Sequence, residues 1–262
     1  MRSKSDFELL FNPLIALLLR EVRRFARIWV QTLVPPVITT SLYFIIFGTL
    51  IGTRVGIIQG LTYAEYIAPG LILMAIITNS YANTVASYFS AKLQRYLEEL
   101  IIAPVPASIL ALSFLAGGIA RGLLVGLIVF LTASIFINFN ILHPVLFCFV
   151  CFCTALIFSS LGLINGIYAK SFDDTSIISS FVLTPLTYLG GVFFSISMLP
   201  PLWSFIAHIN PILFAVNGLR YSVYGITDFS IATIVSLLIM FCFLSVGLSY
   251  YFLHRGLNRG VF

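Results

Sequence analysis

Long apolar segments, separated by short polar stretches, make up most of the chain. Six of these segments reach the roughly 20 helical residues that a transmembrane helix requires. We predict an all-α integral membrane protein with spans at residues 28–51, 66–89, 108–135, 145–168, 176–194 and 231–253. Residues 28–254 then form one transmembrane unit, and residues 255–262 form a short tail.

Residues 1–27, ahead of the first span, have the pattern of an amphipathic helix. Arginine recurs along one face and apolar side chains lie opposite, which is typical of a helix at the membrane surface. The pair Asn12 and Pro13 favours a helix start at that point. A basic cytoplasmic tail without this helix is the alternative. The arginines of the predicted interfacial elbow are Arg20, Arg23, Arg24 and Arg27.

Residues 195–230, before the last span, are apolar but interrupted. Pro200, Pro201, Pro211 and two glycines divide the segment into pieces that are too short to cross a bilayer. We predict two short re-entrant helices, which membranes tolerate where protein covers the broken backbone. The alternative is a seventh span at residues 203–224.

Composition supports a membrane protein, and the charge distribution gives its orientation. Hydrophobic residues make up 60% of the chain and charged residues only 9%. With six spans and a cytoplasmic N-terminus, eleven basic residues lie inside, whereas only Arg54 and Arg220 lie outside. A seventh span would move Arg255 and Arg259 outside, so the count favours six spans and two cytoplasmic termini. The net charge of +5 reflects this topology and does not indicate nucleic-acid binding.

A charged patch at residues 92–102 lies between the second and third predicted spans. As a helix, it would present apolar side chains on one side and charges on the other, and prolines at 104 and 106 would end it. The pattern alone leaves two interpretations open, a solvated loop or a helix that docks on a soluble partner. The candidate docking residues are Leu93, Tyr96, Leu97, Glu98, Glu99, Leu100 and Ile101.

Two other charged sites have candidate roles. Arg121 lies near the middle of the third span, where a charge costs at least about 2.5–3.5 kcal/mol on insertion scales. It is expected either to tie spans together or to contact a transported substrate. Asp173 and Asp174 precede the fifth span, where helix capping explains them and contact with a partner is the alternative.

No enzyme signature is present in the sequence. The P-loop pattern GxxxxGK[ST] is missing, since Lys4 and Lys170 are the lysines that precede a serine, and Ser3 and Ala169 stand where the second glycine should be. Cys148 and Cys151 form a CxxC without a histidine or acid close by in the same span, which argues against a metal or disulfide site. A secondary transporter or channel is the main alternative, but such proteins usually place several ionisable groups at mid-membrane.

Several ordered blocks resemble the permease subunit of ABC-2 type transporters. They include LEELIIAPVP at 97–106, GGIARGLLVG at 117–126, NGIYAKSFDD at 165–174 and LTPLTYLGGVFFS at 183–195. The resemblance implies six transmembrane helices, an interfacial helix before them, and re-entrant helices before the last span. It also implies a multi-pass protein of the bacterial inner (cytoplasmic) membrane.

The resemblance further implies the partners of the chain. Two permease copies pair as a homodimer, and each engages a separate ABC-class ATPase that binds ATP and Mg²⁺, while the permease itself binds no cofactor. The family's principal coupling helix maps onto residues 92–102, which favours the docking interpretation. Because the spans carry little charge, we expect export of an amphiphilic or lipidic substrate out of the cytoplasm or inner leaflet.

Overall fold

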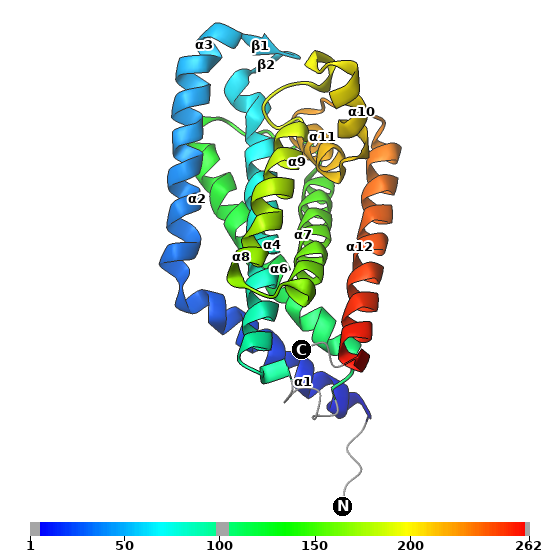
Figure 1. Ribbon diagram of the computed structural model, residues 1–262. Helices are drawn as coiled ribbons and strands as arrows, with labels where there is room; N and C mark the ends of the chain where they lie inside the picture. Colours follow the sequence, from blue (N-terminus) through cyan, green and yellow to red (C-terminus); the bar gives the residue numbers. More distant parts are fainter. Residues whose placement is uncertain (1–5, 98–104, 260–262) are drawn as a thin grey trace, which may run out of the picture.

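A computed structural model describes residues 6–97 and 105–259 as a bundle of long helices (Figure 1). Helix α1 and the end of α12 lie at one end of the bundle, and α3, the strands, α10 and α11 lie at the other (Figure 1). The described elements are α1 (Asp6–Arg27), α2 (Trp29–Tyr43), π-helix η1 (Phe44–Ile51), α3 (Gly52–Val55), β1 (Ile57–Ile58), β2 (Leu61–Thr62), α4 (Tyr63–Leu93), α6 (Ala107–Phe136), α7 (Pro144–Tyr168), α8 (Phe172–Ile178), π-helix η2 (Ser179–Leu183), α9 (Thr184–Leu189), 3₁₀-helix η3 (Ile196–Met198), α10 (Pro201–Ile209), α11 (Pro211–Tyr224) and α12 (Ile231–Arg259).

Four helical segments of the described chain are long and apolar enough to cross a membrane. They are Trp29–Val55, Ala107–Phe136, Pro144–Tyr168 and Ile231–Leu257, and each matches a predicted span. Helix α12 continues to Arg259, beyond the predicted end of the transmembrane unit at residue 254.

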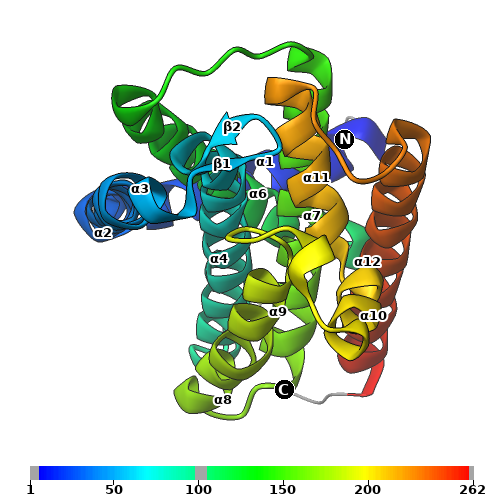
Figure 2. The same ribbon diagram turned by 90° about the horizontal axis from the view of Figure 1, so that it is seen from above.

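The other two predicted spans correspond to helices that do not reach this level of apolarity. Helix α4 covers residues 66–89, but 20 of its residues are buried, so the helix does not need an apolar surface all round. The continuous segment of α8, η2 and α9 covers much of residues 176–194 and has two aspartates in its first turn. Seen from above, α4 and α7 lie between α2 and α12 (Figure 2). The crossing of the membrane by α4 and by the α8 to α9 segment stays a prediction.

The region before the last helix is broken as expected. Helices α10 and α11 meet at an angle of 82°, which is the geometry of a broken span or a re-entrant pair. Asn210 accepts a hydrogen bond from the backbone N–H of Ile212 at 3.0 Å, and Pro211 occupies the first turn of α11. Most of α11 is buried among α4, α7, α9 and α12, so protein covers the break.

Two local predictions are wrong. Helix α1 begins at Asp6 and includes Pro13, so the helix does not start at Asn12 and Pro13. The all-α prediction also misses a short hairpin in which Ile57 pairs with Thr62. Its turn uses Gly60 at φ +85°, a conformation that residues with a Cβ rarely adopt.

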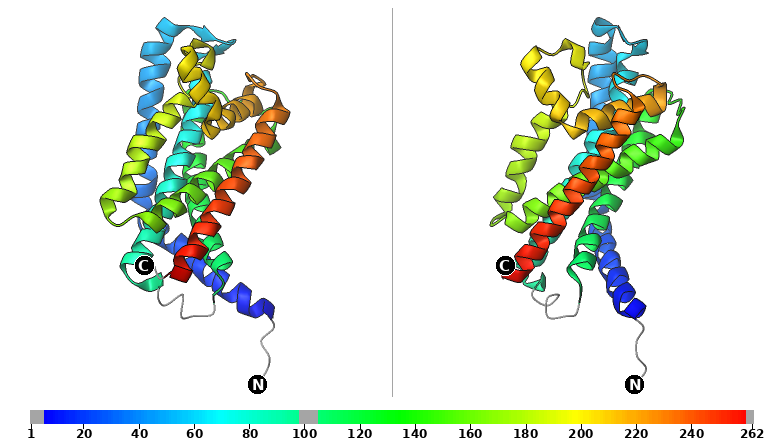
Figure 3. Two further views of the ribbon diagram at one scale, coloured as in Figure 1. Left: turned by 45° about the vertical axis from the view of Figure 1, so that its right-hand side comes forward. Right: turned by 90° about the vertical axis from the view of Figure 1, so that its right-hand side faces the viewer.

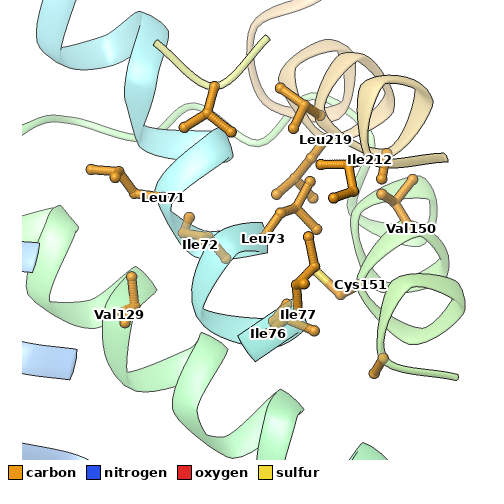
Figure 4. Packing of buried hydrophobic residues seen from close by; sticks show 14 of the residues in the cluster. Leu71, Ile72, Leu73, Ile76, Ile77, Val129, Val150, Cys151, Ile212 and Leu219 are labelled. Carbon is orange, nitrogen blue, oxygen red and sulfur yellow. The ribbon is translucent and has the colours of Figure 1, made fainter. Parts of the chain in front are cut away.

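The core lies between α4 and the helices around it. Side chains of α4 such as Leu73 and Ile76 belong to one buried apolar cluster with Val129 of α6, Val150 of α7 and Leu219 of α11 (Figure 4). A second apolar cluster lies toward the α1 end and includes Leu17, Tyr88, Leu97, Ile109 and Leu253. Helix α1 does not continue the direction of α2 but crosses the end of the bundle (Figure 3).

Helix α6 packs very closely on α4 and α7 through its glycines. A Cβ at Gly118 would overlap the hydroxyls of Thr84 and Ser159, and one at Gly122 would overlap Ser80. This geometry fits the small-xxx-small spacing, which lets transmembrane helices approach closely.

Candidate functional site

The predicted coupling helix is not continuous from its first residue. Helix α4 ends at Leu93, a turn follows at Gln94 and Arg95, and helical conformation resumes at Tyr96. Arg95 has φ +56°, which interrupts a right-handed helix. The start of the predicted helix is therefore wrong, because it combines the end of α4 with a second segment. Four predicted docking residues lie outside the described part of the chain: Glu98, Glu99, Leu100 and Ile101.

The described part of this loop is fastened to the elbow. The guanidinium carbon of Arg20 lies 3.6 Å from the centre of the Tyr96 ring, a cation–π contact. Leu97 has no exposed surface and packs in the second apolar cluster, so its side chain is not available to a partner. Leu93, in contrast, is 60% exposed. Leu93, at the end of α4, is therefore available to a partner, whereas Tyr96 and Leu97 pack against the protein itself.

A second connection joins the end of α4 to the end of α7. Lys92 Nζ donates hydrogen bonds to the carbonyl oxygens of Ile167 and Ala169 at 3.1 and 3.3 Å. These carbonyls belong to the last turn of α7 and the residue after it, where a cation is favourable. Lys92 thus fixes the end of α4, where the loop begins, to the end of α7.

The two aspartates of the 170–174 segment have different roles. Asp174 forms a capping box with Ser171 and accepts a hydrogen bond from the backbone N–H of Lys170 at 2.9 Å. This bond, with those from Ser171, lowers the pKa of Asp174 below its usual value. Asp173 is exposed, and its carboxylate has no partner among the described residues. The geometry therefore assigns capping to Asp174 and leaves Asp173 open to a partner.

The elbow helix contains a buried acid that the sequence reasoning missed. Glu21 is 3% exposed, and its carboxylate accepts a 2.7 Å hydrogen bond from Ser87 Oγ on α4. Arg24 Nη2 lies 3.3 Å from the same carboxylate and donates a 2.8 Å hydrogen bond to Asn83 Oδ1. The position of one glutamate among four arginines indicates that its carboxylate interacts with a partner, but the sequence does not show that the partners lie on α4.

The four predicted elbow arginines do not share one environment. Arg23 and Arg27 are exposed, whereas Arg20 and Arg24 are half-buried against the loop and α4. Together they line one side of a cavity of about 660 Å³, which Gln94 also borders. The helix thus has a basic face, while the face toward α4 and α6 is polar at its centre.

Arg220, which the topology count places in an outside segment, has its side chain buried in the protein interior. It is 1% exposed, its guanidinium carbon lies 3.8 Å from the centre of the Tyr66 ring, and Nη2 donates to Gly191 O at 3.0 Å. Arg121 is therefore not the only charge inside the bundle. Of the two basic residues counted as outside, only Arg54 is exposed.

A groove with mixed polar and apolar walls, and without charged residues in its described lining, lies between α2 and α4. Its volume is about 280 Å³, and its walls combine threonine, asparagine and glutamine side chains with apolar ones. Pro35 and Pro36 lie inside α2 at this point, where they remove backbone hydrogen bonds. The polar lining residues are Gln31, Thr32, Thr39, Thr40, Tyr43, Thr78 and Asn79.

Comparisons of the sequence with known proteins identify its relatives. The family described as "ABC-2 type transporter" matches residues 13–224. The chain is 50% identical over 222 residues to the inner membrane transport permease YadH of Escherichia coli (strain K12), covering 85% of this chain and 87% of that protein. It is 28% identical over 215 residues to nodulation protein J of Sinorhizobium fredii (strain NBRC 101917 / NGR234), covering 80% and 81%.

Proposed function

The chain belongs to the ABC-2 type transporter family as a multi-pass inner-membrane permease, and we propose that it is the membrane subunit of an ATP-driven exporter. Permeases of this family lack an ATPase domain and pair with ATPase subunits. The family match over most of the chain is the observation that carries the proposal. We infer a complex of two permease copies and two ATPases, in which the ATPases bind ATP and Mg²⁺.

The loop after α4 is the proposed site of ATPase docking. Leu93 supplies an exposed apolar contact, and Glu98, Glu99, Leu100 and Ile101 follow in the sequence. Because Tyr96 lies under Arg20 and Leu97 is buried, a displacement of the loop moves α1 and α4 with it. This connection supports a transmission of nucleotide-driven motion from the ATPase to the spans.

An amphiphilic substrate fits the groove between α2 and α4. The groove has hydroxyl and amide groups but neither acid nor base in its described lining. Such a lining suits an uncharged polar group with an attached apolar part. In the reconstituted permease and ATPase pair, neutral amphiphiles should stimulate ATP hydrolysis more than small charged solutes, and the opposite order would refute this substrate class.

Replacing Leu93 with aspartate is expected to release the ATPase without unfolding the permease. Burial of an exposed leucine in an interface contributes about 1.5–3 kcal/mol, so loss of the contact should weaken binding at least about ten-fold. Co-purification of the ATPase with the tagged permease measures this. Ile57→Asp is the matched control, because Ile57 is 74% exposed at the opposite end. Equal ATPase recovery with Leu93→Asp and wild type would refute docking at this loop.

The proposed orientation can be tested with introduced cysteines. Gln94→Cys should react with a membrane-impermeant maleimide only when the cytoplasmic side is accessible, and Ile57→Cys only from outside. Both positions are exposed, at opposite ends of the bundle. Both cysteines are introduced into the Cys148→Ser variant, which removes the exposed native cysteine and leaves the three buried ones. Reversed labelling of the two positions would overturn the orientation.

A further inference from the structure

Arg121 of α6 is a half-buried cation without a hydrogen-bond acceptor among the described residues. Its Nε atom is enclosed and unpartnered. Its two terminal nitrogens also make no hydrogen bond with the backbone and side chains that the structure describes, but they are not enclosed. An arginine within an apolar helix requires an acid, a carbonyl or a water-filled space to interact with. One edge of this guanidinium is therefore open to a ligand.

No acid in the described part of the chain forms an ion pair with Arg121. One turn before it, Gly117 packs on Glu21 so closely that a Cβ at Gly117 would lie 2.9 Å from Glu21 Cβ. The Glu21 carboxylate is already occupied by Ser87 and Arg24. Arg24 lies 3.3 Å from the same Glu21 carboxylate, which packs on α6 one turn before Arg121, so the two cations and one acid share this contact. Two arginines and one glutamate leave one positive charge uncompensated at this contact between α1 and α6.

The surroundings of this charge are those of a lipid-covered surface. On the adjoining face of α6, Leu124 and Leu127 are 39% and 54% exposed. Trp29, at the junction of α1 and α2, is 59% exposed, as is typical of tryptophans at membrane interfaces. A ligand here must combine a negative charge with apolar chains, a requirement that a phospholipid meets and a small soluble anion does not.

We propose that Arg121, together with Arg24, binds the phosphate of an anionic phospholipid at the seam between α1 and α6. A planar guanidinium can donate two parallel hydrogen bonds to phosphate oxygens, and such charge-assisted bonds are strong. The negative charge of the phosphate offsets the repulsion between the two guanidinium groups. The acyl chains cover the exposed leucines of α6. The lipid thereby fastens the elbow to α6.

The experiment measures the melting temperature of the purified full-length permease in detergent. Samples contain mixed micelles with phosphatidylglycerol or phosphatidylcholine, or millimolar inorganic phosphate. We expect phosphatidylglycerol to raise the melting temperature of the wild type by roughly 3–6 °C more than phosphatidylcholine. Arg121→Gln should lose this difference, and Arg121→Lys should keep part of it. The matched control Arg54→Gln, which removes an exposed arginine at the other end, should keep all of it.

A second readout separates lipid binding from a purely structural role. Without added lipid, Arg121→Gln should melt at the wild-type temperature or above it, because the repulsion from Arg24 is removed. A lower melting temperature in lipid-free detergent, with an unchanged difference between the two lipids, would overturn the proposal. Equal stabilisation by inorganic phosphate and phosphatidylglycerol would also overturn it, because the site would then bind a free anion.

Discussion

Replacing Gly118 with alanine is expected to lower the melting temperature of the permease by roughly 5–10 °C. The added Cβ would lie 2.9 Å from the backbone oxygen of Ser80 and would overlap the hydroxyls of Thr84 and Ser159. A side chain can rotate away, but the α4 backbone can move only if the helices separate. Overpacking of this kind costs about 1–3 kcal/mol, and more where backbone must shift.

Two comparisons make this result specific for the helix contact. Gly247→Ala in α12 should melt like the wild type, because a Cβ at Gly247 meets nothing within 4 Å. Gly122→Ala should be destabilised through Ser80, and the double variant Gly122→Ala with Ser80→Gly should regain part of the loss. Wild-type melting of Gly118→Ala, measured by scanning fluorimetry in detergent, would show that the glycines do not control the packing.

Replacing Glu21 with alanine is expected to detach the elbow from α4. The change leaves the Ser87 hydroxyl and the Arg24 guanidinium without their common acceptor and opens a void beside Gly117. Removal of one member of a buried ion pair costs about 3–5 kcal/mol. Because 28% of the Arg24 side chain is exposed, we expect a value near the lower limit, about 3 kcal/mol. Melting in detergent and protease cleavage within residues 20–30 both measure the loss.

The chain offers matched controls for this variant. Glu21→Gln keeps the shape and an acceptor for Ser87, so its loss should be smaller. Asp173→Asn removes an exposed acid without a side-chain partner among the described residues and should change stability little. Adding Arg24→Met to Glu21→Ala removes the uncompensated cation and should restore part of the stability. Additive losses in that double variant would contradict a direct interaction between Glu21 and Arg24.

Features that depend on local pattern could be predicted from the sequence. Apolar runs located four of the long helices, and Pro200, Pro201 and Pro211 indicated the broken segment before α12. The small-xxx-small spacing of Gly118 and Gly122 is likewise a local pattern, and close packing of α6 follows from it. In each case the residue's own chemistry, such as a missing N–H or a missing Cβ, limits the structure.

Features that depend on distant partners could not be predicted. The burial of Arg220 and Glu21 is of this kind, because Arg220 donates to the Gly191 carbonyl and Glu21 accepts from the Ser87 hydroxyl, and both partners are far away in sequence. Leu97 belonged to an apolar stripe whose orientation depends on the turn at Arg95, and that turn places it inside the protein. Amphipathic spacing shows that a face is buried, but it does not show against which surface.

The contact between Arg20 and Tyr96 has a thermodynamic consequence for the assembled transporter. It joins a helix at the edge of the membrane to the loop proposed to bind the ATPase. A displacement of the elbow helix therefore changes the free energy of ATPase binding as well as that of the elbow in the membrane. Linkage is reciprocal: if ATPase binding shifts the elbow, bilayer properties that shift the elbow must change ATPase affinity by the same factor. The thickness and charge of the surrounding membrane then act as effectors of subunit assembly.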